Sequence, residues 1–196
     1  MARQFENRNQ QKHSITILGE GITEQYYFTH LRTLYGFRYT IKPYYFSVTS
    51  LAEMDKKIAE AITDNGFAIA VFDADVAHRN DSEKMKLKTI HRKYDKKKNV
   101  VICDSLTSIE FWFLLHYENT NRFFKDSTAT EKELCKYIHE YEKTTKFLQD
   151  NKWVSNLCAE GKMELAKNRA KTFGTEGGSY SNIYKAFELL EDPKLK

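Results

Sequence analysis

The sequence predicts an α/β fold, in which a Rossmann-type, mostly parallel sheet of four strands is flanked by helices and followed by a helical C-terminal extension. Two observations carry this prediction. The continuous apolar run Phe67–Phe72 is typical of a strand that is buried on both faces, as in a parallel sheet. Segments with strand character also alternate with segments of helical periodicity, which is the pattern of βαβ units.

The first strand and the first helix are predicted on either side of a glycine turn. Ser14–Leu18 alternates polar and apolar residues and is predicted as a strand that ends at Gly19-Glu20-Gly21. The two glycines permit a tight turn and leave the Glu20 carboxylate unobstructed. A helix is expected over Thr23–Tyr35, because aromatic and apolar residues recur at helical spacing, and Glu24 is expected to stabilise its first turn.

The next elements bring the chain to its most apolar strand. Pro43–Val48 is rich in aromatic residues and is predicted as the second strand. A helix with one apolar face is expected over Leu51–Thr63 and is broken by Asn65-Gly66. Phe67–Phe72 is then the third strand, and the residues after Asp75 are predicted as a loop.

The remaining elements divide into two groups. A basic helix over Glu83–Tyr94, a fourth strand over Val100–Cys103 and an apolar helix over Ile109–His116 complete the predicted sheet domain. From Asn119 the pattern is helical. We therefore predict a flexible N-terminus over residues 1–12, an α/β domain over 13–118, and a helical region over 119–196 that packs on this domain, with helices near Thr130–Gln149, Lys152–Lys171 and Ser181–Glu191.

The composition is that of a folded chain and sets limits on its partners. The 196 residues are 41% hydrophobic, which suffices for a core, and the net charge of +4 permits a polyanionic partner without requiring one. The three cysteines are far apart in the sequence and form no zinc motif or disulfide framework, so a cytoplasmic location is expected. No apolar run reaches transmembrane length, so no membrane partner is expected.

Carboxylates follow two of the predicted strands. Glu20 follows the first strand, and Asp73 and Asp75 follow the third. Parallel strands end at one edge of a sheet, so these side chains are expected to converge, and Asp73 and Asp75 would leave an extended chain on the same side. Carboxylates without Cys or His suit a hard cation, with Mg²⁺ the first choice and Mn²⁺ the second. The alternative is that one or both aspartates only begin the next helix or turn.

Two groups of basic residues are candidates for nucleic-acid binding. The first follows the acidic pair, and part of it forms a ridge on one helix face that is suited to a phosphate backbone. The second lies in the helical region. For both groups the alternative is an ordinary solvated helix face. The candidate residues are Arg79, Lys84, Lys88 and Arg92 in the first group, and Lys162 and Arg169 in the second.

Three stretches of the sequence resemble the TOPRIM domain and, within that group, the RloB-like family of bacterial proteins. Ile17–Phe28 contains G-E-G-x-T-E, Val71–Asp75 contains D-x-D after a buried strand, and Ser105–His116 contains Glu-x-Trp followed by Leu-Leu-His. The resemblance covers about Ser14–Tyr117. The sequence departs from the family pattern at Leu106-Thr107, where Asn-Pro is usual.

The resemblance implies a Mg²⁺-dependent nuclease that cleaves nucleic-acid phosphodiester bonds in bacterial anti-phage defence. It makes Glu20, Asp73 and Asp75 the catalytic and metal-binding set, with Glu20 as general base or acid and one or two Mg²⁺ held mainly by the aspartates. Glu110 is either a fourth metal ligand or the capping residue of Thr107-x-x-Glu110. DNA or RNA, including transfer RNA, and an activating defence partner such as an ATPase are the expected partners.

Two other functions stay open at this point. Val71–Val76 also resembles the opening motif of haloacid-dehalogenase phosphatases, with Asp73 as nucleophile and Ser105 in the second motif. That hypothesis lacks a convincing later acidic pair and leaves Glu20 unexplained. The other alternative is a non-catalytic module that senses a nucleotide or nucleic acid through bound Mg²⁺. A topoisomerase or primase is not expected for a chain of this length.

Overall fold

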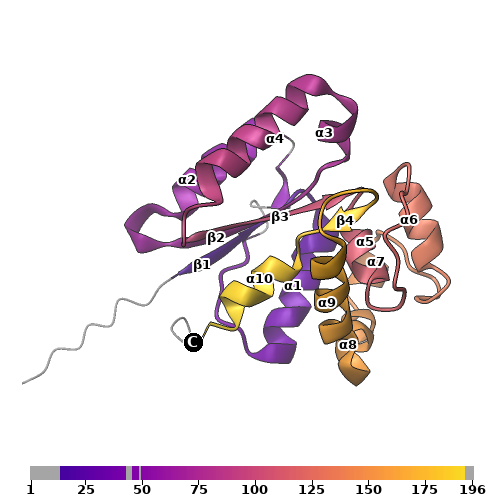
Figure 1. Ribbon diagram of the computed structural model, residues 1–196. Coiled ribbons are helices and arrows are strands. Elements are labelled where there is room, and N and C mark those ends of the chain that lie inside the picture. The colour runs from indigo at the N-terminus through magenta and orange to yellow at the C-terminus, as the bar shows by residue number, and fades with distance from the viewer. Residues whose placement is uncertain (1–13, 43–45, 49, 193–196) are drawn as a thin grey trace, which may run out of the picture.

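A four-stranded sheet separates two layers of helices (Figure 1). The computed structural model describes residues 14–42, 46–48 and 50–192. Strands β1 (Ile15–Leu18), β2 (Phe67–Asp73) and β3 (Val100–Leu106) are parallel neighbours, and the short β4 (Tyr180–Ser181) pairs with β3 in the antiparallel direction. The predicted α/β class and mostly parallel sheet are confirmed. The predicted N-terminal segment, 1–12, lies outside the described residues.

One helical layer covers the sheet with α2 (Leu51–Ala61), the short turn η2 (Thr63–Asn65), α3 (Asp75–Arg79) and α4 (Asp81–Tyr94) (Figure 1). Alternate strand residues point into this layer, as the period-2 geometry of a strand requires. Ala70 and Phe72 of β2 and Ile102 of β3 are buried there with residues of α2 and α4. The long basic helix predicted at Glu83–Tyr94 is confirmed as α4.

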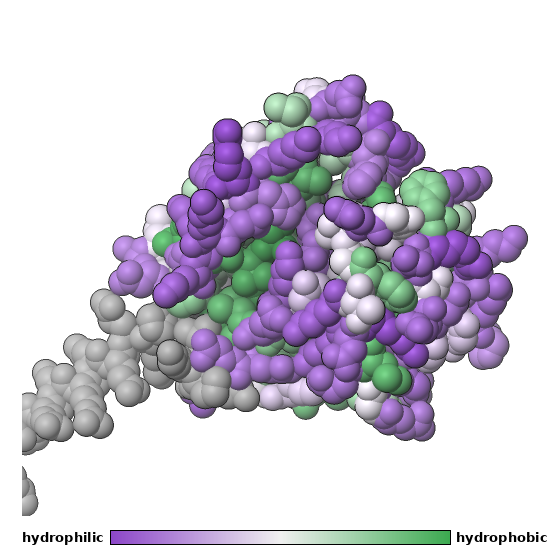
Figure 2. Space-filling model, in the orientation of Figure 1, coloured by the Kyte–Doolittle hydropathy of each residue, from purple (hydrophilic) through white to green (hydrophobic). Residues whose placement is uncertain are grey.

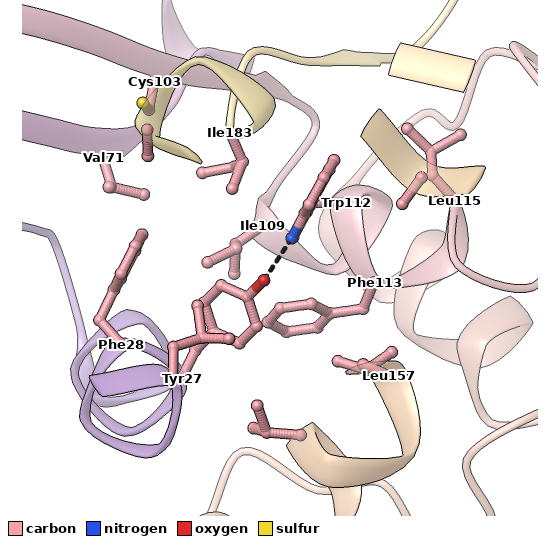
Figure 3. Close-up of a cluster of buried hydrophobic side chains, with 14 of the residues drawn as sticks. Tyr27, Phe28, Val71, Cys103, Ile109, Trp112, Phe113, Leu115, Leu157 and Ile183 are labelled. Atoms are coloured by element: carbon pink, nitrogen blue, oxygen red, sulfur yellow. Dashed lines mark hydrogen bonds between the residues drawn. The ribbon is translucent and has the colours of Figure 1, made fainter. Parts of the chain in front are cut away.

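The second layer holds α1 (Ile22–Tyr35), α5 (Ile109–Leu114) and the helices of the C-terminal region. Every residue of α5 is buried, as its apolar composition predicted. Trp112 of α5 donates an indole N–H hydrogen bond of 2.7 Å to the hydroxyl of Tyr27 in α1, among the buried side chains shown in Figure 3. The C-terminal elements are α6 (Ser127–Leu134), α7 (Thr145–Leu148), α8 (Lys152–Cys158), η3 (Ala159–Gly161), α9 (Lys162–Phe173) and α10 (Tyr184–Leu190).

The fourth strand of the sheet was predicted in the wrong segment. Residues 43–45 of the predicted strand Pro43–Val48 lie outside the described residues, and Phe46–Val48 is not in a strand. The backbone of Thr40 instead bridges to Thr16 of β1. The fourth strand is β4, which the C-terminal region supplies. The division into 13–118 and 119–196 stays a prediction, but one hydrophobic core contains residues of both ranges.

Several predicted boundaries also need correction. The predicted loop after Asp75 contains α3, and β3 continues past Cys103 to Leu106. The two long helices predicted over Thr130–Gln149 and Lys152–Lys171 are each broken into shorter helices. Glu160, with a positive φ of 55°, separates α8 from α9. Helical periodicity detected the buried faces of these segments but not the turns between them.

The surface differs between the layers. Figure 2 shows hydrophilic side chains over the α2–α4 layer and an apolar strip between this layer and α10. Val100, Val101 and Ile102 of β3 line a depression there together with Leu189 of α10.

None of the helices in the described part of the chain is long and apolar enough to cross a membrane.

Candidate functional site

Carboxylates from four segments gather at one end of the sheet. Glu20 follows β1, Glu24 lies in the first turn of α1, Asp73 ends β2, and Glu110 lies in the first turn of α5. Burial and then repulsion from Glu24, Glu20 and Glu110 raise the pKa of Asp73. The four carboxylates are therefore close enough to interact. These residues are called the acidic cluster below. The sequence predicted the convergence of Glu20 with Asp73, and the structure brings them together.

Three members of the acidic cluster, Asp73, Glu24 and Glu20, have raised pKa values. Burial, followed by repulsion from Glu24 and then Glu20, raises the pKa of Asp73 well above its ordinary value. Burial and then repulsion from Glu110 raise the pKa of Glu24 to about 7. Glu20 is an exposed residue, yet desolvation of its carboxylate and then repulsion from Glu24 raise its pKa to about 8. A hydrogen bond from the Asp73 backbone opposes this rise, so Glu20 lies against the end of β2.

The glycine turn after β1 fixes the first two carboxylates. The backbone N–H of Gly21 donates a 3.0 Å hydrogen bond to Glu24 Oε2, which confirms that Glu24 stabilises the first turn of α1. A Cβ atom added to Gly19 would lie 2.7 Å from the Phe46 ring. Gly19 is therefore required by close packing, and the packing sets the direction in which the chain carries Glu20 and Glu24.

Lys143 supplies a positive charge to the acidic cluster from the segment between α6 and α7. Its ammonium nitrogen lies 3.1 Å from Glu110 Oε2 and 3.6 Å from Glu131 Oε2. It lowers the pKa of Asp73 and of Glu24, although repulsion and burial outweigh this effect. The Tyr141 hydroxyl donates a 2.8 Å hydrogen bond to Glu110 Oε1. The sequence did not predict that Lys143 and Tyr141 contact the acidic cluster. Both lie in an irregular charged stretch, where residue spacing indicates no buried face.

The structure also corrects two predictions, one about Glu110 and one about Asp75. Ser108, not Thr107, is the N-cap of α5, so the alternative of a Thr107–Glu110 capping box is wrong. Asp73 and Asp75 were expected to leave one side of an extended strand. This was wrong, because the chain turns at Ala74 (φ −90°, ψ 4°) and Asp75 begins α3. There Asp75 pairs with Arg79, although its charge still raises the pKa of Glu20.

The donor chemistry of the acidic cluster fits a hard divalent cation. It offers only carboxylate oxygens, whose mutual repulsion such an ion would relieve. Across residues 14–42, 46–48 and 50–192, however, no three His, Cys, Asp or Glu side chains are placed to hold a metal ion as they stand. Binding would require the carboxylates to lose protons and move closer together. The structure thus gives the donors but not a finished coordination shell.

The predicted basic residues separate into two kinds. Lys84 and Lys88 line one cleft beside α4, which is described below, whereas Arg92 is exposed and does not line it. Arg79 is paired with Asp75. The second predicted group has structural contacts: Lys162 pairs with Glu160 at 3.0 Å, and Arg169 donates a 2.7 Å hydrogen bond to the Leu115 carbonyl at the end of α5.

Comparison with known proteins supports the resemblance noted in the sequence. A protein-family model described as RloB-like protein matches residues 15–190, which is most of the chain. The match extends through the helical C-terminal region and includes all four members of the acidic cluster. Searches of the curated proteins and of the solved structures returned no match.

Proposed function

The chain belongs to the RloB-like family, and from this premise we propose that it is a Mg²⁺-dependent nuclease with a TOPRIM-like site. The observation that carries the proposal is the acidic cluster at the carboxyl ends of β1 and β2. Ligands of open α/β sheets bind at that edge. Carboxylates with raised pKa values are also more typical of functional sites than of ordinary surface positions.

Asp73 and Glu20 are the proposed principal ligands of the ion, which Mn²⁺ can replace. Asp75 would contribute from the first turn of α3 once its pair with Arg79 opens, and Glu110 would contribute from α5. The bound ion would stabilise negative charge on phosphodiester oxygens. Glu20 is also the proposed general acid or base, acting through the carboxylate oxygen that does not bind the ion.

The substrate and biological setting come from the family resemblance. A site that acts on phosphodiesters through a hard cation suits DNA or RNA, including transfer RNA. A role in bacterial anti-phage defence, with an activating partner such as an ATPase, belongs to the same proposal. Lys84 and Lys88 of α4 form no ion pair within the described part of the chain and support a polyanionic substrate, because neutralised phosphates supply much of the binding energy of nucleic acids.

One contact weighs against the phosphatase alternative. Ser105 would have to face the reacting phosphate, but it is 1% exposed and its hydroxyl lies 2.8 Å from the hydroxyl of Ser181 in β4. The contact between Ser105 and Ser181 instead joins β3 to β4. The sensing alternative differs from the nuclease only in turnover, so the decisive test measures cleavage and binding separately.

The test compares two amide variants that remove one charge each. Full-length wild type, Asp73→Asn and Asp75→Asn are assayed with Mg²⁺ or Mn²⁺ on labelled single- and double-stranded DNA and on RNA, including transfer RNA. We expect Asp73→Asn to lose at least about 100-fold in cleavage rate and Asp75→Asn to lose about 10-fold, as for a supporting residue.

Binding to the same oligonucleotides is measured separately, with and without the metal ion. Cleavage by Asp73→Asn at the wild-type rate would contradict the proposal. Metal-dependent binding without turnover of any substrate by wild type, also in the presence of a candidate activating ATPase, would favour the sensing module.

A further inference from the structure

We propose that a cleft between the α3–α4 pair and the β4–α10 segment binds phosphate groups. We define it as the basic cleft. Its volume is about 510 Å³, and it is lined by five basic side chains from three helices and by neutral hydrogen-bonding groups of the C-terminal region. The basic residues are His78 of α3, Lys84, Lys88 and His91 of α4, and Lys185 of α10. Only the source of the phosphate, a nucleic-acid strand, rests on the proposed function.

A hydrogen-bonded network forms one wall of the basic cleft. Asp104 of β3 is only 2% exposed and accepts hydrogen bonds from the Tyr180 hydroxyl at 2.8 Å and the Asn182 amide at 2.7 Å. His91 Nε2 lies 3.6 Å from the same carboxylate, and His91 Nδ1 lies 3.0 Å from Asp95. The network joins α4 to β3 and the C-terminal segment, and so it holds the two sides of the cleft at a fixed separation.

Both carboxylates in this wall, Asp95 and Asp104, contact His91. The contact with Asp104 is the main reason that the pKa of His91 is raised. Burial alone would raise the pKa of Asp104, but the contact with His91 and the hydrogen bonds from Asn182 and Tyr180 together lower it. Asp104 therefore has partners of its own, and it forms no ion pair with Lys84, Lys88 or Lys185.

The lysines of the basic cleft have no such partners. Lys84, Lys88 and Lys185 form no ion pair with any carboxylate of residues 14–42, 46–48 and 50–192. Other lysines of α4 do: Lys86 lies 2.6 Å from Glu83, and Lys93 lies 2.7 Å from Asp55. The unpaired cations are thus on the cleft side, where a multiply charged anion can contact several of them at once.

The position of the basic cleft relates it to the acidic cluster. Asp73 pairs in register with Ser105, the residue after Asp104, so both sites lie at the same ends of β2 and β3. They lie on opposite faces, because Asp104 pairs in register with the apolar Phe72 of the α2–α4 face. His78, which lines the cleft, follows Asp75 by three residues in α3. A phosphodiester strand that crosses this end of the sheet would place flanking phosphates in the cleft.

The inference is tested by binding in EDTA, so that no result depends on catalysis. Fluorescence anisotropy of a labelled single-stranded oligonucleotide is measured over a range of salt for wild type and for Lys88→Gln, Lys185→Gln and Lys86→Gln. Lys86→Gln is the matched control, since it removes one charge from α4 outside the cleft. Each cleft variant should bind several-fold more weakly, with a slope of log K against log salt that is smaller by about 0.7. The control should keep the wild-type slope.

Two further results identify the ligand or overturn the inference. If ATP and inorganic pyrophosphate compete with the labelled oligonucleotide, and this competition is lost in Lys88→Gln, the cleft binds free phosphate compounds. If only unlabelled oligonucleotide competes, the cleft binds a nucleic-acid strand. Equal weakening by Lys86→Gln and Lys88→Gln, or no binding of any phosphate probe, would overturn it. If metal-dependent cleavage is unchanged in both cleft variants, a nucleic-acid strand is not the ligand of the cleft, and the nuclease proposal stays intact.

Discussion

Asp73 shows how the surroundings of one residue determine its chemistry. The sequence placed it at the end of a buried strand beside a glycine turn, and this much could be predicted from the apolar run before it. The neighbours that set its charge come from elsewhere. Glu24 was assigned only to its own helix, and Lys143 belongs to a segment 70 residues away in an irregular region. A pattern within one element cannot report a contact between two distant elements.

Replacing Lys143 by methionine tests its role at the acidic cluster. The change removes the charge beside buried Glu110 but keeps most of the side-chain volume. We expect a loss of about 1–3 kcal/mol in the free energy of unfolding, less than for a fully buried pair because the Lys143 side chain is 36% exposed. Urea denaturation measures it, with the exposed Lys146→Met as control. Equal stability of Lys143→Met and the control would show that Lys143 is not the counter-charge.

At the scale of elements, the turn between β1 and α1 is the most restrictive part of the site. Its two glycines have different surroundings, although the sequence gives no reason to distinguish them. A Cβ atom at Gly19 would meet the Phe46 ring at 2.7 Å and Glu24 Cβ at 3.1 Å. A Cβ atom at Gly21 would meet only Glu24 Oε2, at 3.4 Å. The positions of Glu20 and Glu24 therefore depend on Gly19 more than on Gly21.

This difference predicts unequal effects of two alanine substitutions. Gly19→Ala should displace the turn and lower metal-dependent cleavage by at least about 10-fold, with a cost of about 1–3 kcal/mol from overpacking. Gly21→Ala should stay within about 3-fold of wild type. Cleavage rates and thermal unfolding of the two variants are compared side by side. A larger defect in Gly21→Ala than in Gly19→Ala would contradict the described packing of the turn.

Short elements mark the limit of what the sequence predicted about the fold. The strands Phe67–Phe72 and Ser14–Leu18 were predicted because burial and alternation extend over several residues. Two elements are too short for such a signal: α3 has 5 residues and β4 has 2. Yet α3 moves Asp75 out of the extended position that D-x-D suggested, and β4 attaches the C-terminal region to β3. Tertiary contacts, rather than local propensity, define both elements.

At the scale of the whole molecule, the acidic cluster couples folding to proton binding, and the proposed ion would couple it to metal binding. The pKa values of Glu20 and Glu24, about 8 and 7, exceed the ordinary value of 4.5. The folded protein therefore binds more protons than the unfolded chain between about pH 5 and pH 8, so this contribution to stability falls as pH rises through that interval. Other groups titrate in the same range. The effect is therefore measured as the difference in stability between wild type and a variant that lacks both carboxylates.

The double variant Glu20→Gln with Glu24→Gln should lack this pH dependence. Its melting temperature relative to wild type should rise between pH 5.5 and pH 8 in metal-free buffer, by about 2–4 °C for each kcal/mol gained. Mg²⁺ should raise the melting temperature of wild type more at pH 8 than at pH 5.5, and should have little effect on the variant. Parallel pH profiles of the two proteins would show that the two carboxylates titrate normally.

The central claim is that the ends of β1 and β2 bind a divalent cation through Asp73 and Glu20. The most direct test is a crystal of the full-length protein soaked in Mn²⁺ at pH 8 and measured for anomalous scattering. We expect an anomalous peak about 2.2 Å from carboxylate oxygens of Asp73 and Glu20. Mn²⁺ bound only elsewhere, with Lys143 still against Glu110 and both carboxylates free of metal, would contradict it.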